Sequence, residues 1–149
     1  LNRMMFEDLQ VDQYFTMAYA EIDLPSGHCR LVQAGHPHPL LLRARGGVQV
    51  LGEGGFPVGL IEDAAYQQSE LTLQPGDRLF LMSDGVTECT DAVRVELGTE
   101  GLVKMLNDNS MLDSPALLEA LLWSLGTYAG GEDFHDDVSG LIFDYRGAG

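Results

Sequence analysis

The sequence has few basic residues and no long apolar run, and both shortages limit what the protein can bind. Its 149 residues include 8 lysines and arginines against 23 aspartates and glutamates, a net charge of −15. Such a surface repels nucleic acid and anionic membranes and attracts divalent cations, although solubility alone would also explain it. No apolar run approaches the about 20 residues of a membrane-spanning helix. We therefore expect neither a nucleic-acid partner nor a membrane partner.

Cysteine is scarce too, and two common motifs are missing. Cys29 and Cys89 fit no metal-binding spacing and cannot form a disulfide framework, which suits a reducing compartment and predicts a cytoplasmic protein. The glycine-rich loop at 52–59 lacks the G-x-x-x-x-G-K-[ST] pattern that cradles phosphates, so we interpret it as an irregular connection. No G-x-S-x-G elbow surrounds Ser83, which argues against a serine nucleophile.

What the sequence does contain predicts one α+β domain in which strands come before helices. The first strands, joined by tight turns, are expected to form an antiparallel meander. The predicted strands cover 14–22, 29–33, 40–43, 48–51, 69–73, 78–82 and 138–145, and the predicted helices cover 1–9, 99–106 and 115–129. Ser114 followed by Pro115 predicts a capped helix start. The apolar stripe of that helix should pack on a sheet face, and it consists of Leu117, Leu118, Leu121, Leu122 and Leu125.

The strand predicted at 78–82 is nearly all apolar, as expected of a strand buried on both faces. It stops at Asp84, which places a carboxylate at the tip of a rigid element. Gly85 is expected to turn the backbone through a positive φ, which its missing Cβ allows. The alternative is an ordinary Asp-Gly turn between two strands.

A second acidic pair, Asp136 and Asp137, directly precedes the last predicted strand. If the two strands run antiparallel, these carboxylates and Asp84 share one edge of the sheet. Carboxylate oxygens suit Mg²⁺ or Mn²⁺ better than zinc, and such a metal activates water for attack on phosphorus. The alternative is a solvated acidic loop. His36 and His38 could also share a metal, although the flanking prolines favour a rigid loop instead.

Five stretches occur in an order that resembles a known family. They are similar to the metal-dependent (PPM) serine/threonine phosphatases of the protein phosphatase 2C type, and more narrowly to their bacterial SpoIIE-like branch, which serves partner-switching and stress signalling. Each stretch alone is a weak signal, but together they span almost the whole chain. They are F-T-M-A-Y-A-E-I-D (15–23), A-G-H-P-H-P-L-L-L (34–42), F-P-V-G-L (56–60), P-G-D-R-L-F-L-M-S-D-G-V-T-E (75–88) and D-D-V-S (136–139).

The resemblance implies a β-sandwich flanked by helices, with two Mn²⁺ or Mg²⁺ ions held by aspartates. It assigns Asp84 and Asp136 as catalytic metal ligands and Asp137 as a further candidate ligand. In the family, a metal-bridging water attacks phosphoserine or phosphothreonine directly, without a phosphoenzyme. Gly35 and His36 match a family motif, from which we assign no catalytic role.

One family motif is missing. An upstream G-D-x-S-G-H-G segment supplies the aspartate that bridges the two metals, and this sequence does not contain it. Because Leu1 and Asn2 match the family's second helix, we expect residues 1–149 to be the C-terminal portion of a single SpoIIE-like domain that lacks its N-terminal strands and first helix. Such a chain should be weak or inactive alone, and its open strand edges would need cover, for example from a second copy.

The sequence therefore predicts part of a phosphatase for a phosphorylated bacterial signalling protein, by resemblance an anti-anti-sigma factor. In the family, such domains often follow a receiver domain of the two-component response-regulator kind or a sensor domain. One alternative is a non-catalytic, degenerate phosphatase fold that binds a regulator or dimerises. Retention of Asp84 and Asp136 favours the enzyme. Another alternative is a small carboxylate-metal phosphodiesterase, which would act on nucleotides.

Overall fold

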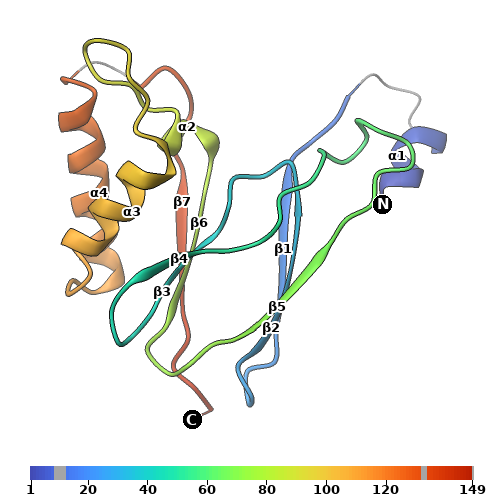
Figure 1. Cartoon of the computed structure of the whole chain (residues 1–149), viewed down its shortest axis with the longest axis horizontal. Coiled ribbons are helices and arrows are strands. Elements are labelled where there is room, and N and C mark those ends of the chain that lie inside the picture. Colours follow the sequence, from blue (N-terminus) through green and yellow to red (C-terminus); the bar gives the residue numbers. More distant parts are fainter. Residues whose placement is uncertain (9–12, 132–133, 149) are drawn as a thin grey trace.

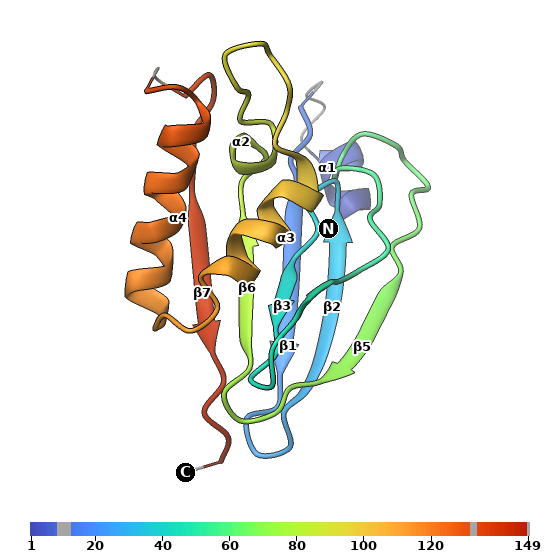
Figure 2. The same ribbon diagram turned by 60° about the vertical axis from the view of Figure 1, so that its left-hand side comes forward.

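A computed structural model describes residues 1–8, 13–131 and 134–148. Two antiparallel sheets face each other, and two helices cover the outer side of one sheet (Figure 1 and Figure 2). The fold is therefore α+β, as predicted. Its elements are α1 (Asn2–Asp8), β1 (Met17–Ile22), β2 (His28–Ala34), β3 (Leu40–Leu42), β4 (Val48–Val50), β5 (Gln68–Thr72), β6 (Arg78–Met82), α2 (Asp84–Thr87), α3 (Gly98–Asp108), α4 (Ser114–Tyr128) and β7 (Gly140–Asp144).

Most elements lie where the sequence predicts them. The strand at 78–82 matches β6, and the other strands differ from the prediction by a few residues at their ends. The helix predicted at 1–9 corresponds to α1, and its last predicted residue, Leu9, lies outside the described residues. In the described part of the chain, no helix combines the length and the apolar character needed to cross a membrane.

The strands do not form the expected meander, because they divide between two sheets. One sheet has the order β1-β2-β5 and the other the order β4-β3-β6-β7. The meander prediction is wrong at one step, since β2 pairs with β5 and not with β3. The reason lies in burial. All three residues of β3 are buried, so β3 needs a layer on each side, whereas β2 buries one face and exposes Arg30 on the other.

The four-stranded sheet is the middle layer of the molecule. Its outer face packs on the two long helices, which supply the buried residues Leu102, Leu106, Leu117, Leu121 and Leu125. Each such leucine stabilises the fold by about 1.5–3 kcal/mol. Its inner face meets the other sheet, where Leu41 packs with Cys29 and Tyr145. The prediction that helices cover a sheet face is confirmed.

Two details of α4 differ from the prediction. Asp113, and not Ser114, caps the helix, since its carboxylate accepts a hydrogen bond of 2.9 Å from the Ala116 N–H. The Ser114 hydroxyl instead donates to the Asp144 carboxylate at 2.7 Å, which ties α4 to the end of β7. Leu122 is 54% exposed, because it projects beyond the strip of the helix that faces the sheet.

Candidate functional site

The pairing of β6 with β7 brings the two acidic segments together. These strands run antiparallel, with Met82 opposite Gly140, and the Ser83 N–H continues the pairing with a 3.0 Å hydrogen bond to the Ser139 carbonyl. Asp84 follows β6, and Asp136 precedes β7 by a few residues. Both segments therefore lie at the same end of the sheet, as the sequence predicts for antiparallel strands.

The Ser83 side chain links the two segments. Its hydroxyl donates to the Asp137 carbonyl at 2.7 Å and accepts a hydrogen bond of 2.9 Å from the Ser139 N–H. The backbone thus uses the hydroxyl as both donor and acceptor. The hydroxyl therefore has a structural role, and the exclusion of Ser83 as a nucleophile stays a prediction.

Gly85 is needed here for a reason other than the predicted one. The prediction of a positive φ is wrong, because Gly85 is the second residue of α2 and is not among the glycines with positive φ. A Cβ at this position would lie 2.6 Å from the Asp137 carbonyl oxygen. Glycine therefore allows α2 to approach the acidic loop closely. The alternative of an ordinary Asp-Gly turn is also wrong, since Asp84 begins a helix.

The end of the four-stranded sheet where the segments around Asp84 and Asp136 meet is here called the acidic corner. Its carboxylates face solvent. Asp84, Asp136 and Asp137 are all exposed. One oxygen of Asp84 accepts from the Gly85 N–H at 3.1 Å, and one oxygen of Asp136 accepts from the Asp137 N–H at 2.7 Å. Among the ion pairs of the described residues, none involves these three carboxylates. Each of Asp84 and Asp136 therefore has an oxygen available for a cation.

The chemical type of these donors fits a divalent cation, but their number is small. Mg²⁺ and Mn²⁺ prefer carboxylate oxygens. However, the described residues include no group of three or more histidine, cysteine, aspartate or glutamate side chains that could hold a metal. The two acidic segments therefore provide a partial ligand set. In the described structure, His36 and His38 likewise have no third metal-binding side chain beside them.

Two pockets of about 310 and 260 Å³ adjoin Asp84, and His36 borders both of them. The histidine rings are anchored to backbone, since Nδ1 of His36 lies 3.0 Å from the Pro37 carbonyl and Nδ1 of His38 lies 2.9 Å from the Leu51 carbonyl. These contacts support the interpretation of a rigid loop.

The loop that carries His36 is held by Gln33, a residue that the sequence analysis missed. Gln33 is 1% exposed. Its amide group donates to the His36 and Pro37 carbonyls and accepts from the Gly54 N–H. A signal did exist, because Gln33 continues the alternation of Cys29 and Leu31 and so places a polar residue at a core position of β2.

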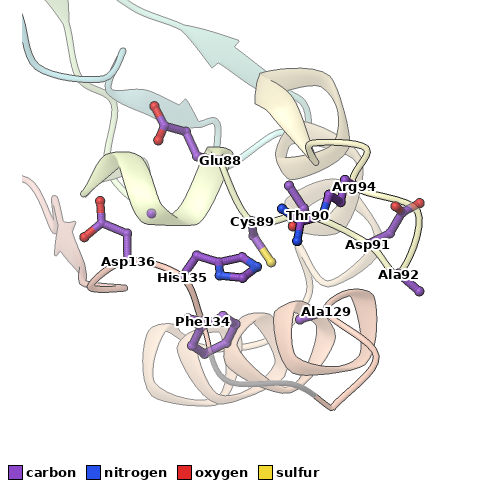
Figure 3. A pocket seen from close by; sticks show the side chains of 11 residues that line it. Glu88, Cys89, Thr90, Asp91, Ala92, Arg94, Ala129, Phe134, His135 and Asp136 are labelled. Atoms are coloured by element: carbon purple, nitrogen blue, oxygen red, sulfur yellow. The ribbon is translucent and has the colours of Figure 1, made fainter.

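A third pocket, of about 230 Å³, adjoins Asp136 and was not predicted (Figure 3). His135 and Phe134 line one side, and the loop after α2 lines the other with Thr90 and Arg94. Cys89 borders it as well, and burial raises the pKa of this thiol, which keeps it protonated. Neither His135 nor Arg94 belongs to a recognisable motif, so the sequence offered no signal for this pocket.

Comparisons with known proteins agree with this architecture. A sequence model of the family described as Stage II sporulation protein E (SpoIIE) matches residues 1–146. The phosphoserine phosphatases RsbP and RsbU of Bacillus subtilis are each 30% identical to the chain over 148 residues. These matches cover 98% and 95% of this chain but 34% of RsbP and 42% of RsbU. The chain therefore spans less than half the length of these two relatives.

Solved structures show the same fold. The SiaA-PP2C domain of Pseudomonas aeruginosa superposes with a TM-score of 0.81 at 21% identity, covering 95% of this chain and 56% of that one. The phosphatase domain of SpoIIE from Bacillus subtilis superposes with a TM-score of 0.74 at 19% identity, covering 97% of this chain and 65% of that one. From the family match over nearly its whole length, and from this shared phosphatase 2C-type fold, we conclude that the chain belongs to the SpoIIE family.

Proposed function

We propose that the whole protein is a metal-dependent serine/threonine protein phosphatase. One observation carries this proposal: the antiparallel pairing of β6 and β7 brings Asp84 and Asp136 to one corner of the sheet. The two relatives named as phosphoserine phosphatases support it. The reaction would be hydrolysis of phosphoserine or phosphothreonine by a water molecule.

In this proposal, Asp84 and Asp136 hold Mn²⁺ or Mg²⁺, and Asp137 is a further candidate ligand. A divalent metal held by these carboxylates would supply an activated water for attack on phosphorus. Ser83 holds the two acidic segments together through its hydrogen bond to the Asp137 carbonyl, and the missing side chain of Gly85 leaves room for them to lie close. Because the described ligand set is partial, we propose that a carboxylate from another part of the whole protein completes it. This chain alone would then be weak or inactive.

We propose a phosphorylated signalling protein as substrate, of the anti-anti-sigma type that the family resemblance implies. The reaction would take place in the cytoplasm, under the control of a sensor or receiver domain in the parent chain. Strands β1 and β7 each end a sheet in the described structure. Such edges present unpaired backbone groups, which a second copy or further parts of the whole protein would cover.

The alternative is a non-catalytic domain that binds a regulator or dimerises. The finding that favours it is the partial ligand set, since a described group of three metal-binding side chains is missing. The alternative predicts that even a longer form of the protein neither binds Mn²⁺ at this corner nor hydrolyses a phosphoprotein.

The test is a calorimetric titration of Mn²⁺ into this chain and into a longer form that carries the preceding residues. Turnover of a phosphoserine peptide would be followed in parallel. We expect Asp84→Asn and Asp136→Asn to lower metal affinity and turnover of the longer form by more than about 100-fold, because the loss of a ligand exceeds the 10–100-fold effect of an outer partner.

Asp63→Asn is the matched control, because it removes the same charge from an exposed loop elsewhere. It should leave both quantities unchanged. If neither form binds Mn²⁺ or turns over the peptide, the proposed phosphatase function is contradicted and the non-catalytic binding domain is supported.

A further inference from the structure

Arg94 adopts an unusual backbone conformation in the loop after α2. Its φ is 63°, and among the described residues every other positive φ belongs to a glycine. A bulky residue in this left-handed region is strained, and such strain is concentrated at functional sites. The position therefore raises the question of what the arginine side chain does.

The turn itself does not need the Arg94 side chain. The Asp91 carboxylate accepts hydrogen bonds of 2.9 Å from the N–H groups of both Val93 and Val95. The base of the loop is closed by a 2.8 Å hydrogen bond from the Leu97 N–H to the Cys89 carbonyl. A glycine would satisfy the same backbone geometry without strain.

The guanidinium of Arg94 is available for a ligand. The hydrogen bonds and ion pairs of the described residues include none made by this group. Arg94 is also the one lysine or arginine among the described residues that line the 230 Å³ pocket beside Asp136. In a chain with a net charge of −15, one unpaired guanidinium at this position is distinctive.

The pocket presents hydrogen-bond donors around this guanidinium. In the view of Figure 3, Arg94 and Thr90 lie at one end, Asp136 lies at the other, and the His135 ring lies between them. The carboxylates of Glu88 and Asp91 point away from the middle of the group. A guanidinium, a hydroxyl and an imidazole in this arrangement fit an oxyanion.

We propose that Arg94 is a specificity-determining residue that binds an oxyanion of the phosphoprotein substrate in the pocket beside Asp136. The oxyanion is either the phosphate of the phosphorylated residue or a carboxylate next to that residue in the substrate. A guanidinium binds both groups through two parallel N–H···O bonds. This inference rests on the proposed phosphatase function, since it assigns the pocket to that enzyme's substrate.

The test is the binding of fluorescent phosphoserine peptides to this chain without divalent metal, followed by fluorescence anisotropy. Arg94→Ala and Arg94→Gly should weaken binding by about 10-fold or more, because a charge-assisted bidentate contact is lost. Arg94→Lys keeps the charge without the planar fork and should give an intermediate affinity. Arg45→Ala, which removes an exposed arginine from the β3–β4 turn, is the matched control and should bind like wild type.

Arg94→Gly separates binding from folding. Because glycine adopts a positive φ freely, this variant should have a melting temperature equal to or above that of wild type. A weaker affinity in a protein that is at least as stable then shows that the side chain binds the peptide. Equal affinities of wild type and all three Arg94 variants, or no binding by wild type, would overturn the inference.

Three peptides identify the oxyanion: a phosphoserine peptide with acidic neighbours, one with alanine neighbours, and an unphosphorylated acidic peptide. If the Arg94 variants also bind the phosphoserine peptide with alanine neighbours more weakly than wild type does, the arginine binds phosphate. If the variants lose affinity only for the peptides with acidic residues, the arginine binds a carboxylate. Either result supports the inference.

Turnover by the longer form separates this inference from the proposed function. If the peptide binds in an Arg94-dependent way but is not turned over, the proposed phosphatase function is contradicted and the proposed oxyanion site at Arg94 is supported. If wild type and Arg94→Gly turn over the peptide with the same kcat/KM, the proposed phosphatase function is supported and the role of Arg94 in substrate binding is overturned.

Discussion

Two aspartates flank β6, and their surroundings are opposite. Asp77, directly before the strand, is 1% exposed and accepts hydrogen bonds from the Gln74 and Ala44 N–H groups and from the Arg43 guanidinium, the last at 2.7 Å. Asp84, shortly after the strand, is exposed, and its carboxylate accepts one described hydrogen bond, from its neighbour Gly85. One carboxylate is fully used by the protein, and the other has an oxygen available for a cation.

The difference shows how one strand can serve both stability and function. At the Asp77 end, the charged side chain itself holds the β3–β4 hairpin and the turn at 74–77 together. At the Asp84 end, the uncharged hydroxyl of Ser83 and the close approach that Gly85 allows hold the two acidic segments together, and the carboxylates remain exposed. We therefore expect the same substitution to affect folding at one end and ligand binding at the other.

The largest effect on stability is expected for Asp77→Asn. An amide cannot accept all of these hydrogen bonds, and the partly buried Arg43 loses its counter-charge, so the free energy of unfolding should fall by about 3 kcal/mol. Urea denaturation measures this value. Asp84→Asn is the matched control and should stay within about 0.5 kcal/mol of wild type. If Asp77→Asn and Asp84→Asn lose the same free energy of unfolding, the two ends of β6 do not differ in their contribution to stability.

A smaller effect is expected for Gly85→Ala. The added Cβ would lie 2.6 Å from the Asp137 carbonyl oxygen, so α2 or the acidic loop must move. We expect a loss of about 1–3 kcal/mol, since overpacking typically has this cost. Gly126→Ala in α4 is the control, because a Cβ there meets nothing within 4 Å. If Gly85→Ala is as stable as wild type, α2 and the acidic loop can move apart to accept the added Cβ without a loss of stability.

The smallest effect is a pH dependence that comes from Asp77. Burial alone would raise the pKa of this carboxyl, but hydrogen bonds from Gln74 and Ala44 and the charge of Arg43 outweigh it and lower the pKa below 3.8. A lowered pKa in the folded state adds stability above pH 3.8, and this stability is lost as the pH falls through the folded-state pKa.

The measurement is urea denaturation of wild type and Asp77→Asn over a range of pH. The difference between their free energies of unfolding should be constant near neutral pH and should shrink in acid. A difference that stays constant down to pH 3 would show that the pKa of Asp77 is not lowered.

Much of the fold could be predicted because it depends on local patterns. The apolar run at 78–82 is β6, and the repeat of Leu117, Leu121 and Leu125 is the buried side of α4. The acidic corner could be predicted from its two segments, since antiparallel neighbours place the end of one strand beside the start of the other. The cap of α4 could not be decided locally, because Asp113 and Ser114 are both good capping residues and the contact of Ser114 with Asp144 selects between them.

Local patterns along the sequence were enough to predict every helix and strand except α2, to place the acidic segments and to indicate the family. The tertiary structure alone decided which sheet each strand joins, why residue 85 is glycine, and that Gln33, Thr90, Arg94 and His135 hold or line the pockets. The physical reason is distance along the chain. Periodicity reports on neighbouring residues, whereas the contact of Gly85 with Asp137 and the pairing of β2 with β5 depend on how separate elements pack.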